Sequence, residues 1–146
     1  VCKRLGSGYG WLMILMSGMG GNLVNCWVHG PDHRAVGAST AVFGAVGIMA
    51  AHQALSSSKH SVRSMFVSLG AGLSLLVFLG SGGERTDLGG HLFGFACGLV
   101  LGGLTGLLPS GDNPRKWPSQ PAWGLVAILI LIWAWSLALE AGGVLR

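Results

Sequence analysis

Five long apolar stretches, separated by short polar connections, dominate this sequence of 146 residues. A stretch of roughly 17–20 apolar residues is long enough to cross the ~30 Å hydrocarbon layer of a membrane as a helix. None of the five contains Lys or Arg, and their only acid is Glu140, at the end of the last stretch. We therefore expect an all-α, polytopic membrane helix bundle with five transmembrane helices, at residues 9–28, 38–55, 64–80, 90–108 and 122–140.

The composition excludes several classes of protein. Apolar residues make up 51% of the chain and charged residues only 10%, which is too little charge to cover the surface of a soluble globule. The 26 glycines are typical of membrane helices that pack closely. The net charge of +4 comes from basic pairs between apolar stretches, without a basic patch, so we expect no nucleic-acid partner. Three cysteines without C-x-x-C spacing predict neither a disulfide framework nor a zinc site.

The distribution of charge predicts which helix ends face the cytoplasm. Alternate connections hold six basic residues and one acid, whereas the opposite connections hold three basic residues against three acids. The positive-inside rule assigns the first set to the cytoplasm. That set is Lys3, Arg4, Lys59, Arg63, Arg115 and Lys116 with Asp112, and the other is Arg34, Arg85 and Arg146 with Asp32, Glu84 and Asp87. We expect a multi-pass integral protein of the bacterial cytoplasmic membrane, with an organelle membrane as the alternative.

Two polar residues, Ser39 and His91, begin the second and fourth stretches. Both stretches run inward, so both residues should lie near the outer face at a similar depth. An ionisable residue in a membrane segment is costly and is a functional candidate by default. A hydroxyl that reaches an imidazole can act as a nucleophile, because the imidazole takes its proton as the oxygen attacks a carbonyl. Taken singly, each residue has a structural alternative: a lone Ser usually bonds its own helix backbone, and a lone His at a helix end is usually interfacial.

The glycines that follow His91 predict a close helix contact on the same face as the imidazole. At about 100° per residue, Gly98 lies about 20° and Gly94 about 60° from the direction of His91. A partner helix that approaches along these glycines could bring Ser39 within hydrogen-bonding distance of His91. Phe43, one turn after Ser39, could pack its ring on the imidazole and limit its rotation.

The segments around these residues resemble motifs of the rhomboid family of intramembrane serine proteases. Residues 37–44 (GASTAVFG) resemble the family's G-x-S-x nucleophile motif, followed by an aromatic residue four positions after the Ser. Residues 87–98 (DLGGHLFGFACG) resemble its histidine helix, with H-x-x-G-x-x-x-G spacing. Over about residues 5–108 the stretches resemble the family's third to sixth helices, and the last stretch resembles its extra C-terminal helix. The sequence departs from the pattern at Thr40, where Gly is common, and at Phe43, where Tyr is common.

The resemblance implies an intramembrane serine endopeptidase that cleaves transmembrane segments of membrane proteins. Ser39 would be the nucleophile and His91 the general base and acid of a dyad that needs no third acid, no metal and no other cofactor. The expected partners are therefore transmembrane protein substrates and the lipid bilayer. The expected oxyanion site is the backbone of Ala38 and Ser39 at a helix N-terminus. The residues expected to support the dyad are Gly37, Phe43, Gly94 and Gly98.

The resemblance also implies elements around the dyad. Residues 81–90 resemble the cap over the family's active site. The family's first two helices, with the His and Asn that complete its oxyanion hole, have no counterpart in these residues. We therefore expect residues 1–146 to be a single, N-terminally incomplete rhomboid-like membrane domain, either a fragment or a shortened homologue. This chain alone could be inactive, because removing an oxyanion donor typically costs ~10²–10³ in rate.

Other functions stay open on the sequence alone. A catalytically inactive rhomboid-like protein would bind transmembrane segments without cleaving them; the missing upstream helices favour it, and the presence of both Ser39 and His91 argues against it. A transporter or channel subunit would carry a charge or a broken helix at mid-membrane, and the five stretches show neither. Asn22 and Asn25 could replace the missing oxyanion donors, although interhelical hydrogen bonds are the commoner role of such residues.

Overall fold

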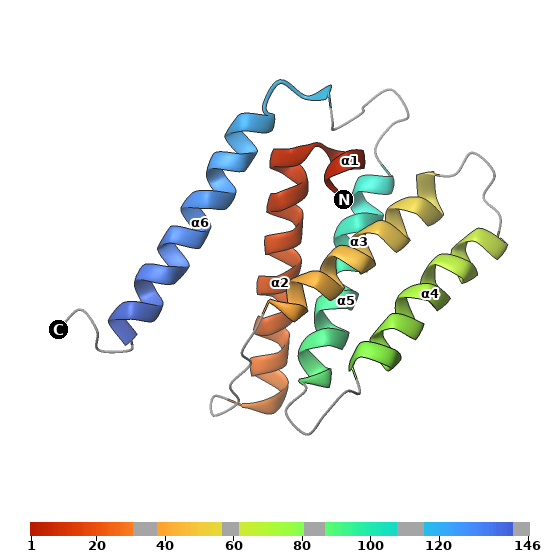
Figure 1. The fold of residues 1–146 in the computed structure, drawn as a ribbon, viewed down its shortest axis with the longest axis horizontal. Coiled ribbons are helices and arrows are strands. Elements are labelled where there is room, and N and C mark those ends of the chain that lie inside the picture. The colour runs from red at the N-terminus through yellow and green to blue at the C-terminus, as the bar shows by residue number, and fades with distance from the viewer. Residues whose placement is uncertain (31–37, 57–61, 81–86, 108–115, 142–146) are drawn as a thin grey trace. The chain divides into compact units, whose positions relative to one another are not determined.

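The computed structural model describes residues 1–30, 38–56, 62–80, 87–107 and 116–141. Within these ranges the chain forms helices and no strands (Figure 1). The helices are α1 (Cys2–Leu5), α2 (Ser7–His29), α3 (Ser39–Ser56), α4 (Val62–Gly80), α5 (Leu88–Gly106) and α6 (Gln120–Ala141). The all-α membrane fold predicted from hydropathy is thus confirmed, and α2 to α6 correspond to the five apolar stretches, with ends that differ by about two residues.

Three of the described helices are long and apolar enough to cross a membrane, namely α2, α5 and α6. Helix α3 is apolar as well, but its apolar part, Ser39–Leu55, is shorter. That all five long helices cross the membrane within one domain stays a prediction.

Helix α1 has no counterpart among the predicted stretches. It ends at Leu5, and the next residue, Gly6, has a φ of +88°, in the left-handed region that glycine adopts without a steric penalty. The amide of Gly6 donates to the carbonyl of Cys2 at 2.9 Å, and the carbonyl of Gly6 accepts from Gly10 at 3.0 Å. The glycine therefore ends one helix and begins the next within a single residue.

The described residues form two compact units, and the larger one contains Val1 and residues 13–112. Within it α3 packs most extensively against α5 and also packs against α4 (Figure 1). The core lies where the rings of Phe43 and Phe95 meet, with Val46 and Leu99 beside them. Helix α4 approaches this core through Gly72, because a Cβ atom there would lie 2.6 Å from the Phe95 ring. A glycine thus lets α4 lie directly on an aromatic side chain.

Glycines also bring the backbones of α3 and α5 into direct contact. A Cβ atom added at Gly94 would overlap the carbonyl oxygen of Thr40, and one at Gly98 would overlap that of Gly44. A Cβ atom at Gly102 would overlap the carbonyl oxygen of Ile48. Each of these pairs is separated by the same 54 positions along the chain, so the two helices run parallel and in register. This is the small-residue contact that the spacing after His91 predicts.

The second unit contains residues 2–12 and 113–146. The side chain of Gln120, the first residue of α6, joins both parts of this unit: its Oε1 accepts from the amide of Tyr9 at 3.0 Å, and its Nε2 donates to the carbonyl of Leu5 at 3.0 Å. The ring of Tyr9 packs on Trp117 and Trp123, with centroid distances of 5.3 and 5.9 Å. Within α6 only Ala127 is buried, which fits a helix that faces lipid along most of its length.

Candidate active site

Ser39 is the first residue of α3, and its side chain is exposed. The carbonyl of Ala38 accepts the first helical hydrogen bond, from the amide of Val42 at 3.1 Å. Ala38 is therefore the residue at the helix cap, and the amides that follow it have no partner within the helix. Such amides, together with the positive end of the helix dipole, can stabilise a negative charge that forms beside Ser39. Gly37, expected to support this turn, lies outside the described residues.

His91 lies in the first turn of α5, where its side chain is only 6% exposed. Its Nδ1 atom is buried and has no hydrogen-bond partner among the residues that the structure describes. The imidazole packs on the ring of Phe43, with 4.4 Å between the ring centroids and 33° between the planes. Phe43 is itself buried, so this contact restrains the imidazole from one side, as the sequence spacing predicts.

The first turns of α3 and α5 lie side by side. A Cβ atom at Gly90 would lie 3.1 Å from Oγ1 of Thr40, and one at Gly94 would overlap the carbonyl oxygen of Thr40. These two glycines flank His91, and Thr40 follows Ser39. In the parallel register of the helices, Ser39 is level with residue 93 and therefore about 3 Å along the axis from His91.

No hydrogen bond joins the Ser39 hydroxyl to the His91 imidazole in this part of the structure, where both side chains are described. The two described groups are thus on adjacent helix ends without a hydrogen bond between them. Catalytic hydrogen bonds are often long or poorly aligned in the absence of substrate and tighten only in the reacting complex. The arrangement places the two residues on neighbouring helix ends, and the reaction would need a hydrogen bond that the described residues do not form here.

A polar network lies next to His91 on the side of α2. Asn25 is 1% exposed, and its Nδ2 donates to Oδ2 of Asp87 at 2.6 Å. Asp87 is the N-cap of α5, and its Oδ1 accepts from the amide of Gly90 at 2.9 Å. The expected interhelical role of Asn25 is confirmed by this bond, whereas Asn22 is exposed. The role of Asp87 was not predicted, although an Asp three residues before the capped amide of a helix is a typical N-cap signal.

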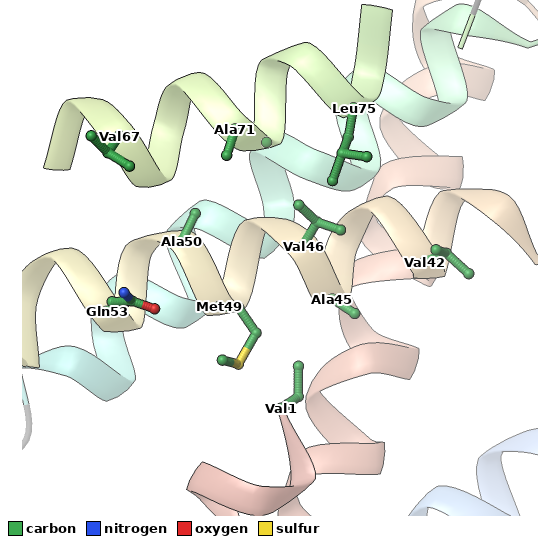
Figure 2. Close-up of a pocket in the computed structure, with 11 residues that line it drawn as sticks. Val1, Val42, Ala45, Val46, Met49, Ala50, Gln53, Val67, Ala71 and Leu75 are labelled. Carbon is green, nitrogen blue, oxygen red and sulfur yellow. The ribbon is translucent and has the colours of Figure 1, made fainter. Parts of the chain in front are cut away.

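A groove of about 530 Å³ opens between α3 and α4 (Figure 2). It begins at Val42, one turn after Ser39, and continues along the same face of α3 through Val46 and Met49 to Gln53. Val67, Ala71 and Leu75 line it from α4. Apart from Gln53 these side chains are apolar, so the groove suits an apolar occupant.

Two further expectations concern the surroundings of the dyad. Residues 81–86 of the predicted cap lie outside the described residues, and its described end, 87–90, contains Asp87 and the start of α5. Within the described ranges, no three His, Cys, Asp or Glu side chains gather closely enough to hold a metal ion.

Comparison with known proteins supports the resemblance seen in the motifs. The family model described as the Rhomboid domain matches residues 1–107, which include α1 to α5 with both Ser39 and His91. No curated protein and no solved structure matches the chain. With its long apolar helices the chain is an integral membrane protein. Because the family model matches well over half of its length, the protein belongs to the rhomboid family.

Proposed function

We propose that this protein is an intramembrane serine endopeptidase that uses Ser39 as nucleophile and His91 as general base and acid. The observation that carries the proposal is the buried imidazole of His91, packed on Phe43 and adjacent to the exposed first residue of α3. Family membership supports the same class of chemistry.

The proposed reaction follows from the chemistry of these groups. The Ser39 hydroxyl attacks the carbonyl carbon of the scissile peptide bond while an imidazole nitrogen of His91 takes its proton. Because Nδ1 is buried, Nε2 is the nitrogen that exchanges this proton. Amides at the N-terminus of α3 stabilise the oxyanion, and the imidazolium then protonates the departing amine. Water, activated by the same imidazole, hydrolyses the acyl-enzyme and regenerates the hydroxyl.

The proposed substrates are transmembrane segments of membrane proteins. The groove between α3 and α4 supports this class, because its lining is apolar and it begins one turn from the nucleophile (Figure 2). An apolar segment in the groove would lie along the same face of α3 as Ser39. The carbonyl to be attacked would then come from the end of that segment, where the helix breaks and a peptide bond becomes accessible.

A fluorophosphonate reagent tests the proposal, because it reacts with an activated serine and not with an ordinary hydroxyl. The protein is reconstituted in liposomes, treated with the reagent, and the modified residue is identified by mass spectrometry. We expect modification at Ser39, its loss in Ser39→Ala, and a strong decrease in His91→Ala. Ser136→Ala is the matched control, since the Ser136 hydroxyl donates to the carbonyl of Trp133 within α6. A wild-type protein that stays unmodified at Ser39 while an active family member reacts would contradict the proposal.

A second candidate function is a rhomboid-like protein that binds transmembrane segments without cleaving them. The observation in its favour is that Ser39 and His91 do not share a hydrogen bond in the described structure. This function predicts that a photoreactive transmembrane peptide crosslinks equally to wild type and to Ser39→Ala, with no cleaved product from either. Cleavage by wild type alone would exclude it.

A further inference from the structure

Asp87 holds the backbone of the first turn of α5 at two places. Its Oδ1 accepts from the amide of Gly90 at 2.9 Å, and its own carbonyl accepts from the amide of His91 at 3.2 Å. The position of the His91 backbone therefore depends directly on the position of Asp87. A capping residue needs only one of its two carboxylate oxygens for this work.

The second carboxylate oxygen of Asp87 ties this turn to a different helix. Oδ2 accepts from Nδ2 of Asn25 at 2.6 Å across a separation of 62 residues. Asn25 is almost completely buried, and within the described part of the chain its Oδ1 has no hydrogen-bond partner. A buried amide with an unsatisfied oxygen costs stability that an apolar residue would not. The property that distinguishes Asn25 from an apolar side chain of the same size is its hydrogen bond to Asp87.

Close packing leaves little freedom around this bond. A Cβ atom at Gly89 would lie 2.5 Å from Oδ1 of Asn25 and 2.9 Å from Cε1 of His29. The backbone at the start of α5 therefore lies directly against α2. The glycine contacts hold the body of α5 against α3, and the bond to Asn25 adds an attachment on α2 at the first turn itself, where His91 lies.

The imidazole of His91 depends on this attachment more than a histidine usually does. In many hydrolases a third side chain binds the other ring nitrogen and orients the ring. Here Nδ1 is buried and has no hydrogen-bond partner among the described residues, so the ring contact with Phe43 is the described restraint on the side chain itself. Rotation of the first turn of α5 by a few degrees would therefore move the imidazole relative to Ser39, and among the described contacts of the side chain only the Phe43 ring opposes that movement.

We propose that Asn25 is a positioning residue for His91, which acts through Asp87 to fix the rotation and depth of the first turn of α5. The proposal rests on the proposed function, since it assumes that the distance from the imidazole to Ser39 matters for the reaction. It assigns Asn25 no contact with substrate. Its consequence is that Asn25 sets the rate of attack by Ser39 and leaves substrate affinity unchanged.

The first measurement compares two asparagines of α2 in the liposome labelling assay. Asn25→Ala should slow the modification of Ser39 by about 10- to 100-fold, the loss expected when catalytic groups are displaced by up to 1 Å. Asn22→Ala is the matched control, because Asn22 is exposed three residues earlier on the same helix, and it should stay within about twofold of wild type. With a cleavable transmembrane substrate, Asn25→Ala should lower kcat and leave KM unchanged. Equal labelling rates for Asn25→Ala and wild type would overturn the proposal.

An exchange of the two side chains separates positioning from a general loss of folding. Asn25→Asp alone sets two carboxylates against each other and should be slower than Asn25→Ala. In the double variant with Asp87→Asn, the new amide donates to residue 25 while its oxygen still accepts from Gly90, so both hydrogen bonds are restored. The double variant should recover most of the wild-type rate. If the double variant has wild-type thermal stability but its labelling rate does not recover, the bond between residues 25 and 87 does not set that rate.

A readout that needs no catalysis distinguishes this proposal from the proposed function. If wild-type Ser39 does not react at all, the protease proposal fails, and the position of His91 can still be measured by NMR of a selectively ¹⁵N-labelled imidazole. Asn25→Ala should shift the His91 resonances, the exchanged pair should return them toward wild type, and Asn22→Ala should leave them in place. Unshifted resonances in Asn25→Ala would overturn the positioning role independently of activity.

Discussion

Gly98→Ala is the sharpest single test of the contact between α3 and α5. The added methyl group would overlap the carbonyl oxygen of Gly44 and lie 2.8 Å from its carbonyl carbon and 2.9 Å from its Cα atom. All three are backbone atoms, so no side chain can rotate away to make room. The two helices must separate at this level.

The size of the separation follows from the same distances. Ordinary van der Waals contact begins at 3.4 Å, so the carbonyl carbon 2.8 Å away must retreat by at least about 0.6 Å, and the overlapping oxygen by more. Overpacking of this kind in a well-packed core costs about 1–3 kcal/mol of stability. His91 lies two turns away on the same helix, and a displacement approaching 1 Å there would slow the reaction of Ser39 by up to about 100-fold.

Gly103→Ala gives the matched control on the same helix. Among the described residues, a Cβ atom at Gly103 would have only Cδ1 of Leu55 near it, at 3.8 Å, which is ordinary contact. Replacing a glycine inside a helix by alanine without a clash should raise stability by roughly 0.5–1 kcal/mol. Both variants are compared with wild type by thermal unfolding in detergent and by the rate of Ser39 labelling. If Gly98→Ala matches Gly103→Ala in both measurements, the backbone contact between the helices is not as described.

Two further substitutions test other contacts. Phe43→Leu removes the ring that packs on His91 and should slow Ser39 labelling several-fold. Such ring pairs contribute about 0.5–1.5 kcal/mol beyond their buried area. Phe66→Leu on α4 is the control: its ring is exposed, so the labelling rate should stay unchanged. Gln120→Ala removes the hydrogen bonds to Tyr9 and Leu5 and should lower the free energy of unfolding of the second unit by roughly 1–3 kcal/mol. Denaturant unfolding measures this change, and Gln53→Ala is the control because Gln53 is exposed. A stable Gln120→Ala variant would show that this side chain does not hold the unit together.

The parts of the fold that the sequence predicts are those set by length and periodicity. Runs of apolar residues indicate the five long helices, and the glycine spacing after His91 indicates the face on which α5 meets α3. Helix α1 carries no such signal, because four residues are too few for a period and its end depends on the left-handed φ of Gly6. Ser39 and His91 could be assigned to helix ends because hydropathy gives the depth of a residue along a helix.

The bond between Asn25 and Asp87 could not be predicted in the same way. Hydropathy and charge fix depth and direction but leave the rotation of each helix about its axis open. An error of one residue, about 100° of rotation, would turn Asn25 from a buried position to an exposed one, as the exposure of its neighbours Val24 and Cys26 illustrates. The partner of a buried amide therefore appears only when the rotations of α2 and α5 are known together.

The same reasoning explains why the candidate site depends so strongly on the backbone. A side chain that orients an imidazole through its second nitrogen can correct small errors in helix position, and none of the described residues is such a partner for Nδ1 of His91. Its position is instead set by the glycine contacts between α3 and α5, the ring of Phe43 and the cap at Asp87. Substitutions in these contacts should therefore lower kcat far more than they raise KM, because they change the approach of imidazole and hydroxyl while the apolar groove between α3 and α4 keeps its lining.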